Sequence, residues 1–151
     1  MTIELLNQES PYLKEAIAYF WNQWGSESNY DFYRDCIENS LATEISLPKF
    51  YVLLDQDNIV GSYALLTNDI ISRQDLMPWF ACLLIDDDYR KQGLAQKLLN
   101  HGLDQARQKG YDYLYLSTDL IGFYEKKGWD YYAKAFGLSG DEFNVYSKST
   151  H

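Results

Sequence analysis

The sequence predicts an α/β domain with a mixed central sheet of about six to seven strands flanked by four helices. Strand-like runs and amphipathic segments follow one another in the order β–α–α–β–β–β–α–β–α–β–β. No apolar run approaches the ~20 residues of a membrane-spanning helix. The 151 residues include 46% hydrophobic and 23% charged side chains, which is typical of a globular protein. We therefore expect residues 1–151 to form one domain.

The first half of the chain is expected to combine two helices with three strands. A short strand is predicted over residues 2–6. Ser10 is the candidate N-cap and Pro11 the first residue of a helix that ends at Gly25. Apolar side chains recurring on one face predict a second helix over residues 30–41. Two strands joined by a polar hairpin follow, over residues 50–54 and 59–67.

The second half is expected to begin with a loop that has a polar middle, over residues 68–78. The next strand, 79–85, is apolar throughout and is therefore predicted to be central in the sheet. A helix should run from Leu94 to a stop at Gly110. The remaining elements are expected to be a strand over 111–117, a short helix over 119–127 ended by Gly128, and strands over 129–136 and 142–147.

Charge and composition narrow the classes of partner. The formal net charge is −9, which disfavours nucleic acid as a partner because phosphate contacts need clustered Lys and Arg. Such a charge favours a cationic partner or substrate, or it serves only solubility. The N-terminal segment has neither the basic nor the apolar region of a signal peptide, so we expect a cytoplasmic protein without a membrane partner. Cys36 and Cys82 are expected to be free thiols.

The strongest local signal is the stretch from Trp79 to Arg107. An apolar strand ends in the acidic run Asp86-Asp87-Asp88, a loop containing Gly93 follows, and a helix then begins. The first N–H groups of a helix have no intrahelical partner, so this order predicts an anion site. Gly93 allows a backbone approach that a Cβ would block. The glycine patterns of P-loops and dinucleotide-binding folds are absent. The acidic run lacks the residue spacing of a calcium-binding loop, so we expect this run to be a solvated strand end.

Two motifs resemble those of a known family. Ile85-x-x-x-x-Arg90-x-x-Gly93-x-Ala95 after an apolar strand resembles the acyl-CoA motif of the GNAT superfamily of N-acetyltransferases. The segment Phe123-Tyr124-Glu125-Lys126-Lys127-Gly128-Trp129 resembles the F-Y-x-K-x-G-F segment of the same family. The predicted order of elements also matches along nearly the whole chain. The resemblance implies a GNAT-type fold.

No His/Cys cluster in the sequence has zinc-ligand spacing, so no metal is expected. The resemblance implies acetyl-CoA as co-substrate. Its pyrophosphate would lie on backbone amides of the loop, and its pantetheine arm beside the apolar strand. The implied cofactor-binding residues are Leu83, Leu84, Ile85, Arg90, Lys91, Gln92, Gly93, Leu94, Ala95 and Gln96. Lys91 stands where the family often has Gly, and Ser117 where many members carry an Asn that holds the cofactor.

Acetyl transfer needs a deprotonated amine, a donor to the oxyanion and a proton for the departing thiolate. Tyr124 is the candidate catalytic residue, since the resemblance places its phenol beside the CoA sulfur; the alternative is that it only packs. Phe123 is expected in the core. The general base stays open, because water could relay the proton or one of four acidic residues could take it: Glu44, Asp69, Asp75 or Asp119.

The resemblance thus implies an acetyl-CoA-dependent N-acetyltransferase that acts by direct attack in a ternary complex. The acceptor would be a small-molecule or peptide amine, cationic if the acidic and aromatic composition reflects the pocket. The protein would be a monomer or a homodimer. A non-catalytic acyl-CoA-binding regulatory module on the same fold is the alternative hypothesis.

Overall fold

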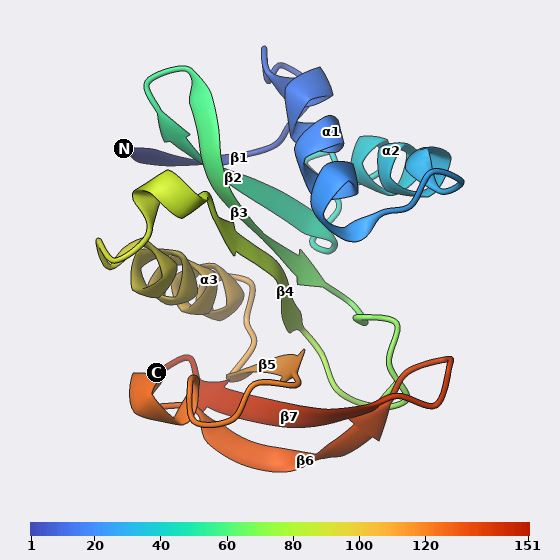
Figure 1. Ribbon diagram of the computed structural model, residues 1–151, viewed down its shortest axis with the longest axis vertical. Helices are drawn as coiled ribbons and strands as arrows, with labels where there is room; N and C mark the ends of the chain where they lie inside the picture. The colour runs from blue at the N-terminus through green and yellow to red at the C-terminus, as the bar shows by residue number, and fades with distance from the viewer. The chain divides into compact units, whose positions relative to one another are not determined.

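The computed structural model describes residues 1–151 and contains seven strands, three α-helices and two 3-10 helices (Figure 1). The strands are β1 (Thr2–Leu5), β2 (Lys49–Asp55), β3 (Asn58–Leu66), β4 (Trp79–Ile85), β5 (Tyr113–Thr118), β6 (Asp130–Phe136) and β7 (Glu142–Ser149). The helices are α1 (Leu13–Trp24), α2 (Tyr30–Glu38) and α3 (Leu94–Gln108), and the 3-10 helices are η1 (Asp87–Tyr89) and η2 (Glu125–Lys127).

The strands form a mixed sheet in the order β1-β2-β3-β4-β5-β7-β6. The pair β4–β5 is parallel, whereas β1–β2, β5–β7 and β6–β7 are antiparallel. The predicted α/β class with a mixed sheet is confirmed, and β4 has its predicted bounds and its predicted central place in the order. Its residues Trp79 and Phe80 are almost fully buried, as its apolar sequence requires.

The backbone divides into two compact units, each described by itself. The N-terminal unit comprises Met1–Ala64 and Cys82–Leu98, and the C-terminal unit comprises Leu65–Ala81 and Leu99–His151. Both β4 and α3 therefore contribute residues to each unit.

In the N-terminal unit, α1 and α2 pack beside each other, as Figure 1 shows. Helix α1 buries Ala16, Ile17 and Phe20, which a spacing of three to four residues places on one face, as the sequence predicts. Phe20 meets the ring of Phe50 on β2 edge-on, with ring centroids 5.2 Å apart. This aromatic contact fixes the helix on the strand.

In the C-terminal unit, β7 lies between β5 and β6 and pairs with both. The loop from β3 to β4 is bonded to the end of β6, where Ser72 N–H donates to the Phe136 carbonyl and Phe136 N–H donates to the Ser72 hydroxyl, both at 2.9 Å. Ile71 and Leu76 of this loop belong to a buried hydrophobic cluster. The other buried members are Trp79, Ala135 and Val145. The loop is thus an ordered part of the unit.

Two predicted helix boundaries and one predicted helix are wrong, for local reasons. Ser10 does not cap α1, because its hydroxyl accepts the N–H of Asn7 at 3.0 Å in a preceding turn; Pro11 lies before the helix. Helix α2 ends at Glu38, since the Ser40 hydroxyl donates to the Ile37 carbonyl at 2.6 Å. The fourth predicted helix, over residues 119–127, is only the 3-10 helix η2, because Gly122 adopts φ +85° and breaks the segment.

None of the α-helices has the combination of length and apolar character that a bilayer-spanning helix needs. Neither Cys36 nor Cys82 is part of a disulfide, as expected.

Candidate functional site

The loop between η1 and α3 adopts the geometry of an anion site. Lys91 and Gly93 both have left-handed backbone conformations, with φ of 63° and 75°. The N–H of Lys97 donates to the Gly93 carbonyl at 3.1 Å, which is the first turn of α3. The amides of Gly93, Leu94 and Ala95 therefore have no acceptor within the helix. A Cβ placed on Gly93 would meet no atom within 4 Å, so the loop faces open space.

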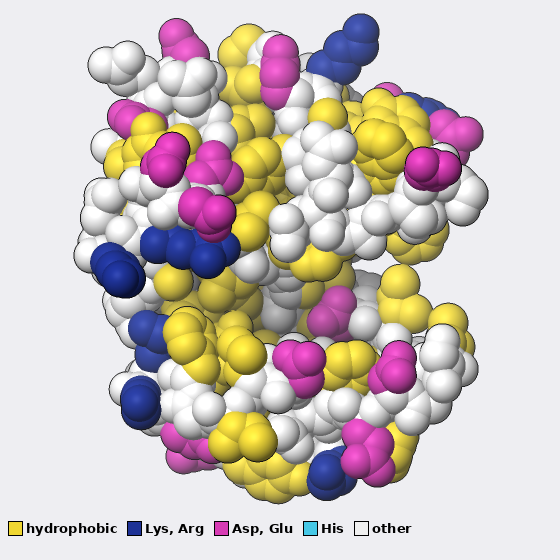
Figure 2. Space-filling model, viewed as in Figure 1, with side chains coloured by type: hydrophobic (Ala, Val, Ile, Leu, Met, Phe, Trp, Pro, Cys, Tyr) yellow, Lys and Arg dark blue, Asp and Glu magenta, His cyan; other side chains and the backbone are white.

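The basic side chains near this loop are partly engaged by the protein itself. The Arg90 Nε donates to the Ile85 carbonyl at 3.2 Å, and its guanidinium pairs with Asp87 at 3.1 Å. Arg90 thus fastens the loop to the end of β4. The Lys97 ammonium donates to the Met1 carbonyl at 3.3 Å. Figure 2 shows Lys and Arg side chains gathered here, directly beside acidic ones. The backbone amides remain the main anion donors.

Two tyrosines that the sequence analysis did not single out tie the acidic strand end to the rest of the N-terminal unit. Tyr19 on α1 donates its hydroxyl to Asp86 at 2.6 Å, and Tyr89 donates to Asp55 at 2.7 Å. The expectation that Asp86 is merely solvated is therefore wrong. Burial and the hydrogen bond to Asp86 raise the pKa of Tyr19, which keeps the phenol protonated and donating. The two partners are 67 residues apart, so no local pattern signals them.

The second half of β4 departs from regular strand geometry. Cys82 has φ 57°, a left-handed residue of the kind that marks a bulge, and its carbonyl accepts the Ser62 hydroxyl at 2.9 Å. Leu83 and Leu84 are only partly buried, unlike the first half of the strand. A pocket of about 520 Å³ opens at this end, lined by Gln23 of α1 and by the run from Leu84 to Arg90. Gln23 is a lining residue that sequence reasoning missed.

Tyr124 lies in the C-terminal unit and is buried. Its ring meets those of Phe123 and Trp129 edge-on, with centroid separations of 4.9 and 6.3 Å. Burial raises the pKa of the Tyr124 phenol, so it is protonated at neutral pH. Beside it, the indole N–H of Trp129 is buried without a hydrogen-bond partner.

Phe123 is 39% exposed, so its predicted place in the core is wrong. The Lys127 ammonium lies 5.0 Å from its ring centroid. The ring planes of Phe123 and Tyr124 differ by 78°, and of the two rings only that of Tyr124 is buried.

The four acidic residues left open as bases have different surroundings. Asp69 is partly buried and accepts a hydrogen bond from the Ser117 hydroxyl at 3.3 Å. Burial raises the pKa of Asp69 to about 6, against the smaller lowering effect of Ser117. Asp75 is exposed and paired with Arg73 at 2.8 Å, which lowers the pKa of Asp75. Glu44 and Asp119 are exposed.

The predicted site residues thus fall into two groups. Leu83, Leu84 and Ile85 and the segment 90–96 are continuous along β4, the loop and the first turn of α3. Tyr124 belongs to the C-terminal unit, together with Asp69 and Ser117. No group of three or more His, Cys, Asp or Glu side chains is arranged to hold a metal ion.

Comparison with known proteins identifies the family. Residues 6–129 match the model of the acetyltransferase (GNAT) family. The chain is 27% identical over 132 residues to N-alpha-acetyltransferase 30 of Schizosaccharomyces pombe, covering 83% of this chain and 72% of that relative.

Solved structures of the same fold include aminoglycoside 6'-N-acetyltransferase from Enterococcus faecium, with a TM-score of 0.73 at 16% identity, covering all of this chain and 98% of that one. A GNAT family acetyltransferase from Elizabethkingia anophelis with acetyl-CoA bound has a TM-score of 0.63 at 14% identity, covering 98% of this chain and 97% of that one. The family match spans both motifs and most of the elements described above. The chain is therefore a GNAT-family N-acetyltransferase.

Proposed function

We propose that the protein transfers an acetyl group from acetyl-CoA to a primary amine by direct attack in a ternary complex. The observation that carries this proposal is the loop with two left-handed residues, Lys91 and Gly93, at the N-terminus of α3. Successive amides that converge in this way bind the oxygens of a phosphate chain. The similar structure from Elizabethkingia anophelis contains acetyl-CoA, which supports the same donor here.

The donor would lie along the continuous segment from β4 to α3. Its pyrophosphate would accept from the amides of Gly93, Leu94 and Ala95, while Lys91 and Gln92 frame the open loop. The pantetheine arm would follow the partly exposed end of β4 at Leu83 and Leu84, where a backbone amide near Ile85 could polarise the thioester carbonyl. In this proposal Arg90 acts by holding the loop on the Ile85 carbonyl.

Tyr124 would act as the proton donor to the departing CoA sulfur. Its raised pKa means that the phenol carries its proton at neutral pH, and so it can donate to the thiolate as negative charge develops there. The buried indole N–H of Trp129 is a further uncommitted donor next to the same ring.

The acceptor we propose is a cationic amine. The net charge of −9 favours the approach of such a molecule over that of an anion. Among similar structures, the protein from Enterococcus faecium is an aminoglycoside 6'-N-acetyltransferase, and the relative from Schizosaccharomyces pombe is an N-alpha-acetyltransferase. Amines of the aminoglycoside, polyamine and peptide classes therefore belong in the same screen.

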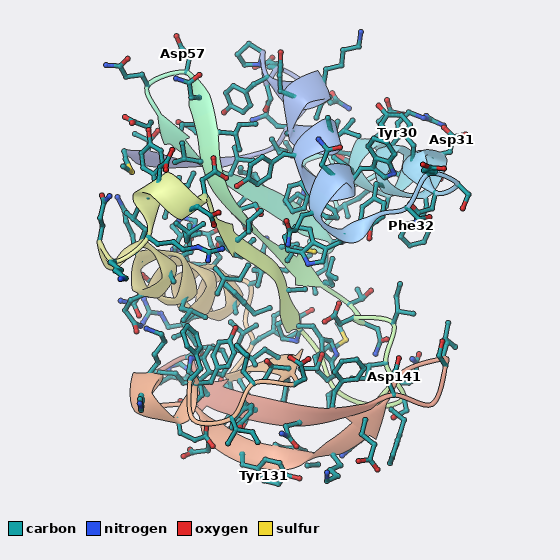
Figure 3. The ribbon with its side chains drawn as sticks, viewed as in Figure 1. Tyr30, Asp31, Phe32, Asp57, Tyr131 and Asp141 are labelled. Carbon is teal, nitrogen blue, oxygen red and sulfur yellow. The ribbon has the colours of Figure 1, made fainter.

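The experiment is acetyl-CoA turnover across a panel of amines, with CoA binding measured separately. In the Tyr124→Phe variant we expect kcat to fall about 100-fold and the KM for acetyl-CoA to change little, since only the developing thiolate loses a donor. Tyr131→Phe is the matched control, because Tyr131 is 52% exposed on β6 (Figure 3).

Each outcome of the screen has a defined meaning. Tight CoA binding without turnover of any amine would favour the non-catalytic acyl-CoA-binding module. Absence of CoA binding would overturn both hypotheses. Acetylation of neutral or anionic acceptors alone would overturn the proposed cationic acceptor.

A further inference from the structure

The loop that carries Asp69 is held in place by its own side chains. The side-chain oxygen Oδ1 of Asn68 accepts from the Ile71 N–H at 3.0 Å and from the Gln74 side-chain amide at 3.1 Å. The side-chain amide of Asn68 donates to the backbone carbonyl of Arg73 at 3.1 Å. Asp69 lies inside this network and is followed by a left-handed residue, Ile70, with φ 51°. Its carboxylate is therefore positioned before any substrate arrives.

The carboxylate of Asp69 has the environment of a base. The side chain that β5 presents to it is the neutral Ser117 hydroxyl, 3.3 Å from the nearer oxygen. The cation on the same loop, Arg73, is occupied by Asp75 through two hydrogen bonds of 2.8 and 2.9 Å. Arg73 is therefore not available to neutralise the charge of the Asp69 carboxylate. A carboxyl pKa of about 6 leaves it ionised at neutral pH yet more basic than an ordinary aspartate.

Ser117 also locates Asp69 along the sheet. Tyr115 on β5 pairs with Trp79 on β4, and Ser117 lies two residues further toward the carboxyl end of β5. In open α/β sheets, ligands bind outside the carboxyl ends of the parallel strands. Asp69 therefore borders the part of β5 that leads from the pairing with β4 to the turn carrying Tyr124.

We propose that Asp69 is the general base, and that its carboxylate binds the ammonium group of the acceptor and removes one proton from it. This assignment rests on the proposed acetyl transfer and names the residue that prepares the nucleophile. It also requires an acceptor that arrives as a cation.

The protons balance as follows. The acceptor enters as an ammonium ion and gives one proton to Asp69. The nitrogen lone pair attacks the thioester carbon, the carbon–nitrogen bond forms and the carbon–sulfur bond breaks. The nitrogen then loses a second proton, which ends on the departing thiolate with Tyr124 as the proposed donor to sulfur. Asp69 returns its proton to water, so the products are the amide, CoA thiol and one proton.

The test compares kcat/KM for an amine substrate between pH 5 and 9 in four proteins. The wild type should lose activity below an apparent pKa near 6. Asp69→Asn should lower kcat/KM at pH 7.5 by about 100-fold or more and remove this acid limb, while CoA affinity stays within about twofold. Ser117→Ala should move the acid limb to higher pH, because Ser117 lowers the pKa of Asp69. Asp141→Asn, an exposed aspartate after the β6 hairpin turn, is the matched control (Figure 3).

Retention of activity, or of the acid limb, in Asp69→Asn would overturn the base assignment and leave the proposed function standing. Absence of turnover in the wild type with every amine would overturn the proposed function and the assignment with it. Circular dichroism checks that Asp69→Asn is folded. If it is not, the Ser117→Ala profile decides, because an acid limb that does not move overturns the assignment.

Discussion

Replacing Asp69 by Asn should stabilise the protein at neutral pH. The folded pKa is about 6, against an ordinary 3.8, so the folded state keeps this proton to a higher pH than the unfolded chain does. The free energy of unfolding therefore falls as the pH rises from 3.8 to about 6 and is level above that value. At about 1.4 kcal/mol per pH unit, the gap amounts to at most about 3 kcal/mol. Partial exposure of the side chain to water lowers this figure.

Asn cannot ionise and keeps the hydrogen bond from Ser117, so the variant escapes this cost. We expect Asp69→Asn to equal the wild type in stability near pH 4 and to exceed it by about 1–3 kcal/mol at pH 7. Urea unfolding followed by circular dichroism at pH 4, 5, 6 and 7 measures the difference. A difference that does not vary with pH, or a variant less stable at pH 7, would refute the reasoning. Asp141→Asn should show no such dependence, because Asp141 is exposed.

Two further predictions concern the loop between η1 and α3 and the strand end that precedes it. Gly93→Ala should weaken CoA binding, measured by calorimetry, about 5- to 30-fold, because a φ of 75° costs an alanine about 1–2 kcal/mol. The new Cβ meets no atom within 4 Å, so this backbone cost is not accompanied by a clash within the protein. Gly140→Ala, at φ 86° and equally open, carries the same backbone cost far along the chain and should leave CoA affinity unchanged; equal losses in both variants would contradict a role for the loop. Tyr19→Phe removes the 2.6 Å bond to Asp86 and should lower the free energy of unfolding by about 1–2 kcal/mol in urea titrations, and a loss below about 0.3 kcal/mol would show that this bond is not structural.

A stabilising Asp69→Asn variant with reduced turnover would be the expected pattern for an active-site acid. Functional groups are commonly held in environments that cost stability, because the properties that make them reactive also make them unfavourable in the folded state. The partly buried carboxylate of Asp69, with its raised pKa, is one such group. The pH dependence of kcat/KM and the pH dependence of unfolding therefore both test the raised pKa of Asp69.

The central part of the fold could be predicted because its signals are local. An unbroken apolar run predicted β4 with correct bounds, and the helical spacing of leucines predicted the start of α3 at Leu94. Helix ends were less accessible, since a single competing hydrogen bond, such as that of Ser40 to Ile37, decides them. Gly122 was a visible signal against the fourth helix.

The position of the loop proposed to hold the donor could also be predicted, but its conformation could not. Lys91 stands where the family often has Gly, and only the structure shows that this lysine adopts φ 63° beside Gly93 at 75°. A left-handed lysine is unfavourable in isolation, so local propensity argues against it. The surrounding contacts, including the Arg90 bond to the Ile85 carbonyl, hold the turn that contains it.

The sequence by itself determined the fold class, the family and the segment proposed to hold the donor, because each depends on residues close together in the chain. Only the tertiary structure separated Asp69 from three other acidic candidates and joined Tyr19 to Asp86. Their partners lie 48 and 67 residues away, and burial, which raises the pKa of Asp69, is a property of the packed chain. Local patterns specify backbone and motif, whereas the reactivity of a side chain depends on what folding brings next to it.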